Sequence, residues 1–124
     1  NLNIKDYCDA VDLLINKESK KIEKNIFNIV YENMSILELA QLVKKIFDAK
    51  YNKSIDVIRT ESNDNRSYHI NSDKIKDELG FIPSHSISDA INSLFDAFDK
   101  KLVPNSFEDD IYFNVKRMQN KKVK

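Results

Sequence analysis

Glycine is nearly absent from this sequence, with one residue in 124, against a usual share of about 7%. A loop that binds a dinucleotide or a nucleoside triphosphate needs several glycines, because their backbone can approach the phosphates closely. The chain contains neither Gly-x-Gly-x-x-Gly nor a Walker loop. We therefore expect no dinucleotide cofactor to bind to these residues alone.

Cysteine is equally scarce. Cys8 is the only one, which excludes an intramolecular disulfide and weakly favours a reducing compartment, so we expect a cytoplasmic protein. We interpret Cys8 as a small buried apolar residue, since no activating base can be placed beside it. His69 and His85 show no paired ligand spacing, so no metal site is expected.

Long apolar runs and an excess of one charge are also missing. No segment approaches the roughly 20 residues of a membrane span, and no signal peptide is visible. Lys+Arg and Asp+Glu both number 20, which argues against general attraction to nucleic acid. The last ten residues carry five basic residues and no acid, which indicates a solvated terminus, with nucleic-acid contact as the alternative. Because the chain begins with Asn, we expect the natural amino terminus to lie upstream.

Periodicity and capping residues predict an α/β fold. Asn3 and the Ser35–Glu38 capping box mark helix starts, and Gly80 and Pro104 mark ends. The first helix carries apolar residues on one face, namely Ile4, Tyr7, Cys8, Val11, Leu14 and Ile15. Helices are expected over 3–16, 35–48, 72–79 and from 86 up to Pro104, with short strands over 25–30 and 55–59 and a brief extended segment over 68–70.

Two sequence blocks carry a resemblance to a known family. They are Glu78-Leu79-Gly80-Phe81-x-Pro83 and the block that runs from Ile26-Phe27-Asn28-Ile29 to Leu39. Together with the order of elements, they resemble the C-terminal substrate-binding region of the NAD-dependent epimerase/dehydratase family, the extended short-chain dehydrogenases that modify nucleotide sugars. The resemblance covers residues 1–103 and leaves 104–124 as a tail.

The resemblance implies a part of an enzyme rather than a complete one. Members of the family bind NAD(P) on an N-terminal Rossmann domain, which is missing here, and use a Tyr-x-x-x-Lys pair as the catalytic base. The only such spacing in this chain is Tyr112 to Lys116, in the tail, and we interpret it as coincidence. We therefore expect no catalytic residue and no bound cofactor in this chain alone.

The loop over 60–68 contains the expected substrate-binding residues. Carried over from the family, Asp64 stands where an aspartate accepts from ribose hydroxyls, and Tyr68 where a residue lines the sugar pocket. Arg66 or Arg59 would meet the diphosphate, because Glu61 stands where the family often has arginine. The alternatives are an ion pair for Arg66, a turn role for Asp64 and core packing for Tyr68.

The implied partners are a nucleotide sugar and the missing Rossmann domain, without nucleic acid or membrane. The strand over 25–30 would join the Rossmann sheet, and without that sheet it would leave an edge open to self-association as a homo-oligomer. A different function class is a stand-alone helical interaction module without enzymatic activity, whose tail after Pro104 reaches a partner.

Overall fold

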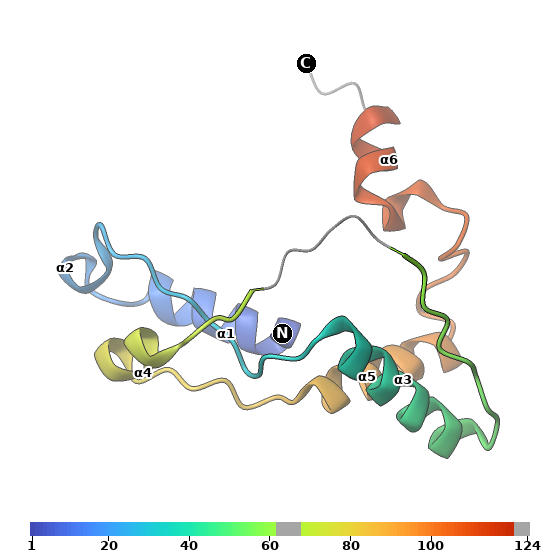
Figure 1. Ribbon diagram of the computed structural model, residues 1–124. Helices are drawn as coiled ribbons and strands as arrows, with labels where there is room; N and C mark the ends of the chain where they lie inside the picture. Colours follow the sequence, from blue (N-terminus) through green and yellow to red (C-terminus); the bar gives the residue numbers. More distant parts are fainter. Residues whose placement is uncertain (62–67, 121–124) are drawn as a thin grey trace. The chain divides into compact units, whose positions relative to one another are not determined.

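The computed structural model describes residues 1–61 and 68–120, and every regular element within them is helical (Figure 1). The elements are α1 (Ile4–Ile15), α2 (Ser19–Ile22), α3 (Ile36–Tyr51), α4 (Asp73–Leu79), α5 (Ile87–Asp99), the 3-10 helix η1 (Asp110–Tyr112) and α6 (Asn114–Asn120). The chain forms two compact units, Asn1–Asn92 and Ser93–Lys124, and the boundary falls inside α5. None of the helices in the described ranges is long and apolar enough to cross a bilayer.

Three local signals mark helix ends as predicted, whereas α5 ends at Asp99 and does not extend to Pro104. The Asn3 side chain accepts from the backbone N–H of Lys5, and the Ser35–Glu38 capping box is complete. Gly80 ends α4 with a φ of 73°, a left-handed conformation in which a side chain would be strained. Each of these signals needs only a few neighbouring residues.

The predicted α/β fold is wrong, because no strand occurs within residues 1–61 and 68–120. The segments expected as strands, 25–30 and 55–59, are not paired in a ladder with each other or with 68–70. Side chains bond to the backbone instead. The Ser72 hydroxyl accepts from the N–H of Val30 at 2.7 Å and donates to its carbonyl at 3.1 Å. High β-propensity does not make a strand without a neighbouring strand.

The core of the first unit is small. Its buried apolar residues are Ala10, Ile75, Leu79, Ile87 and Ile91, and Asn3 and Asp6 are buried beside them. On α1 the buried face therefore carries Asn3, Asp6 and Ala10. The predicted apolar face is largely exposed, and Cys8 is exposed too, so its interpretation as a buried residue is wrong.

Candidate functional site

Two of the four predicted substrate-binding residues lie in the described part of the chain. Arg59 is exposed on the irregular segment that follows α3. Tyr68 is 73% exposed, which contradicts the core-packing alternative for its ring. Asp64 and Arg66 lie outside the described residues. The structure therefore does not test whether the four residues meet, and their roles remain predictions.

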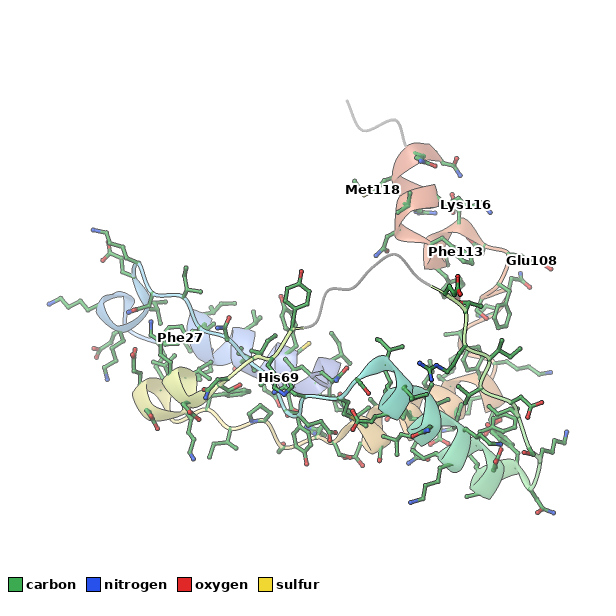
Figure 2. The ribbon with its side chains drawn as sticks, viewed as in Figure 1. Phe27, His69, Glu108, Phe113, Lys116 and Met118 are labelled. Carbon is green, nitrogen blue, oxygen red and sulfur yellow. The ribbon has the colours of Figure 1, made fainter. Side chains whose placement is uncertain are left out.

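A hollow of about 470 Å³ lies beside the residues that follow Tyr68. It is a shallow depression that is widely open to solvent, not an enclosed cavity. His69, one of its lining residues, sits on the segment that leads into α4 (Figure 2). The full lining is Val30, Tyr31, Asn33, His69, Ile70, Asn71, Ser72 and Asp73.

Two side-chain clamps hold the walls of this hollow together. The amide of Asn33 donates to the carbonyl of Ile70 at 2.9 Å and accepts from its N–H at 3.1 Å. The Ser72 hydroxyl bonds to both backbone groups of Val30 in the same manner. Each clamp satisfies a donor and an acceptor at once, as a strand neighbour would. The segments 30–33 and 70–72 are thereby fixed against each other.

Most polar groups around the hollow are already engaged. Asn71 donates to the carboxylate of Asp73 at 2.6 Å and accepts from its N–H at the same distance, and Asn33 and Ser72 form the clamps. The Tyr31 hydroxyl and the His69 ring form no hydrogen bond with another residue of the described ranges. These two groups are therefore available to a ligand, and the sequence reasoning missed both for this role.

A second, smaller hollow adjoins the first. It measures about 170 Å³ and shares Val30, Tyr31, Ser72 and Asp73 with the larger one. Its other lining residues are Lys76, Phe81, Ile82 and Pro83. Apolar residues and residues with polar or charged side chains together line the combined surface.

Asp6 forms a separate buried polar centre. It is 1% exposed, and its carboxylate accepts from the N–H groups of Ser84 at 3.0 Å and His85 at 2.9 Å. The Nδ1 atom of His85 lies 2.8 Å from Oδ1, a contact that requires the ring proton on Nδ1. Burial alone would raise the pKa of Asp6, but these hydrogen bonds outweigh it and lower the pKa below its ordinary value.

This centre is an anchor between α1 and the loop before α5. Asp6, Asp9 and His85 each offer one ligand atom, all within 4.8 Å of one another. However, both oxygens of Asp6 already accept from Ser84 and His85, so a cation would have to displace those donors. We assign the cluster a structural role. Sequence spacing did not reveal it, because Asp6 and His85 lie 79 positions apart.

The sequence has no glycine-rich phosphate loop of the kind that binds a dinucleotide. Binding through a phosphate loop needs a run of glycines at the start of a helix, and the single glycine, Gly80, instead follows the last residue of α4. No protein-family model, no curated protein and no solved structure matched this chain.

Proposed function

We propose that this chain is the nucleotide-sugar binding part of an NAD-dependent epimerase or dehydratase. The observation that carries the proposal is the 470 Å³ hollow, whose lining residues 69–73 follow closely on the segment that contains Asp64 and Arg66. Its rigid clamps and its two available polar groups suit a ligand with many hydroxyls. The two sequence blocks that resemble the family, over 26–39 and 78–83, give a second, separate support.

Each predicted residue has a chemical role in this proposal. Arg66 presents a planar fork of donors to the diphosphate, with Arg59 as a second cation. Asp64 accepts from the ribose hydroxyls, and Tyr68, whose side chain is exposed, contacts the sugar. NAD(P) and the Tyr-x-x-x-Lys pair would belong to a Rossmann domain outside these residues. This chain contributes binding and orientation only, in the cytoplasm and without nucleic acid or membrane.

Calorimetric titration of UDP-, GDP- and dTDP-sugars onto the full-length protein that carries these residues tests the proposal. One of the three should bind, and Arg66→Ala should weaken it about tenfold or more, because a charged hydrogen-bond donor to phosphate is lost. Lys45→Ala, which removes one positive charge from an exposed position of α3, should leave the affinity unchanged. If none of the sugars binds, the proposal is wrong.

A helical interaction module is the second candidate, and the tail gives the observation that favours it. After Pro104, apolar side chains are strongly exposed: Phe107 at 87%, Val115 at 70% and Met118 at 66%. Met118 and Phe113 both project from this segment (Figure 2). Removing residues 104–124 should leave sugar binding intact under the first proposal. Loss of binding to a protein partner, with no sugar binding at any stage, would favour the second.

A further inference from the structure

The exposed face of α1 is a continuous apolar stripe. Ile4 is 71% exposed, Tyr7 54%, Val11 37% and Ile15 75%, and Cys8 lies exposed among them. Their spacing of three or four residues places them along one side of the helix. The other side, with Asn3, Asp6 and Ala10, packs on the core of the first unit. The stripe therefore has no cover within the described residues of this unit.

One flank of this stripe carries charges of opposite sign at its two ends. Lys5 lies near the start of α1 and Asp12 near its end, seven residues apart and so on the same side of the helix. Both side chains are exposed. The other flank leads to the buried residues Asn3 and Ala10, where the rest of the unit lies.

We propose that this stripe pairs with the same stripe of a second copy, with the two α1 helices antiparallel. In an antiparallel pair, like flanks meet, so Lys5 of one copy comes close to Asp12 of the other, twice by symmetry. Ile4 then lies near Ile15 of the second copy, and Tyr7 beside Val11. A parallel pair would instead turn the Lys5 flank towards the side occupied by the body of the partner.

The size of the stripe determines how tightly we expect the two copies to bind each other. The stripe occupies one side of a single helix of 12 residues, so we expect it to bury less than the roughly 800 Å² per partner of standard interfaces. We therefore expect a weak, reversible dimer. A formal net charge of zero means that the copies do not repel each other at long range. This inference does not depend on the proposed function.

Sedimentation equilibrium over a range of micromolar concentrations tests the dimer. Ile4→Asp should weaken it about tenfold or more, because a charge enters the apolar contact. Ile36→Asp is the matched control: Ile36 is also an exposed isoleucine at the first position of a capped helix, here α3, and its replacement should leave the dimer unchanged. Circular dichroism of each variant checks that the helices remain folded.

A charge exchange tests the antiparallel direction. Lys5→Glu or Asp12→Lys alone brings like charges together across the pair and should weaken the dimer several-fold, whereas the double variant should restore it. A short bismaleimide should join two copies through Cys8, the only cysteine, and Cys8→Ser should abolish this product. A monomer at every concentration, or equal effects of Ile4→Asp and Ile36→Asp, would overturn the proposal and leave the stripe to a different chain.

Discussion

Side-chain hydrogen bonds between remote segments link the first unit, whereas those of Asp110 in the second unit join residues close in sequence. In residues 1–92, Asp6 bonds to His85 across 79 positions, Ser72 to Val30 across 42 and Asn33 to Ile70 across 37. In residues 93–124, the Asp110 carboxylate accepts from Arg117 at 2.8 Å and Asn120 at 3.1 Å, only seven and ten positions away. Asp6 thus links segments that are far apart in the sequence, whereas Asp110 links residues within one short stretch.

Asp6 is buried, whereas Asp110 and Arg117 are partly exposed, so we expect the loss of their contacts to change the free energy of unfolding by different amounts. Asp6 is 1% exposed, so removing it leaves donors of the 84–85 loop facing the interior without an acceptor. The side chain of Asp110 is 27% exposed and that of Arg117 is 39% exposed, so water can replace either partner. A buried donor that loses its acceptor costs far more than an exposed ion pair contributes. The first unit should therefore depend on single side chains, and the second should not.

Asp6→Ala should have the largest effect. It removes the acceptor of four hydrogen bonds from Ser84 and His85, and we expect a loss of about 3 kcal/mol in the free energy of unfolding. Urea titration followed by circular dichroism measures it. Asp9→Ala, at an exposed position of the same helix, should change stability by less than about 0.5 kcal/mol. Equal losses for the two variants would mean that the buried centre is not an anchor.

Low pH should weaken the contribution of Asp6 to the free energy of unfolding. The pKa of Asp6 in the folded protein is lowered from the ordinary 3.8, so its contribution is complete above that value. It is lost as the pH falls through the lowered pKa, because the folded state then has to take up a proton. Urea midpoints measured from pH 7 down to pH 2 should converge for the native protein and Asp6→Asn at low pH. A constant gap between them would contradict this linkage.

Three of the helix ends were predictable because their causes are local, whereas the end of α5 at Asp99 was placed too late, at Pro104. Asn3, Ser35 with Glu38, and Gly80 each act within one turn of helix, and the structure confirms all three. The strands over 25–30 and 55–59 were predicted from β-branched and aromatic residues, but a strand exists only with a neighbour, and no neighbour is present in the described ranges. Propensity described the segments correctly as non-helical and could not supply their partner.

The candidate site was harder to predict for the same reason. Tyr31 and His69 reach one hollow only because Asn33 and Ser72 clamp two remote segments together, and no spacing rule contains that information. Likewise, the apolar stripe of α1 was predictable from the sequence, but the sequence did not show that it faces solvent and not the core. A helix with a buried Asp6 opposite its apolar side reverses the usual arrangement.

Ser72→Ala should reduce the free energy of unfolding by an intermediate amount. It tests the contribution of the hydrogen bonds between Ser72 and the remote residue Val30. The variant removes both bonds to the Val30 backbone, and we expect a loss of about 1 kcal/mol in unfolding free energy. Ser93→Ala, at an exposed position of α5, should be neutral or slightly stabilising, since alanine favours helix. A loss confined to Ser72→Ala, measured by urea titration, would show that a single hydroxyl can replace a strand neighbour.

Arg117→Ala should have the smallest effect. The hydrogen bonds from Asn120 and Arg117 lower the pKa of Asp110, yet both partners are accessible to water and can be rehydrated when the pair is broken. We expect the thermal midpoint to stay within the error of the measurement, with faster amide exchange limited to α6. The contrary result would be a thermal midpoint that Arg117→Ala lowers as much as Asp6→Ala does. In that case the sequence separation between hydrogen-bonded residues would not determine how much they contribute to stability. The stability of the second unit would then need another source, such as a partner that buries the exposed apolar residues of the tail.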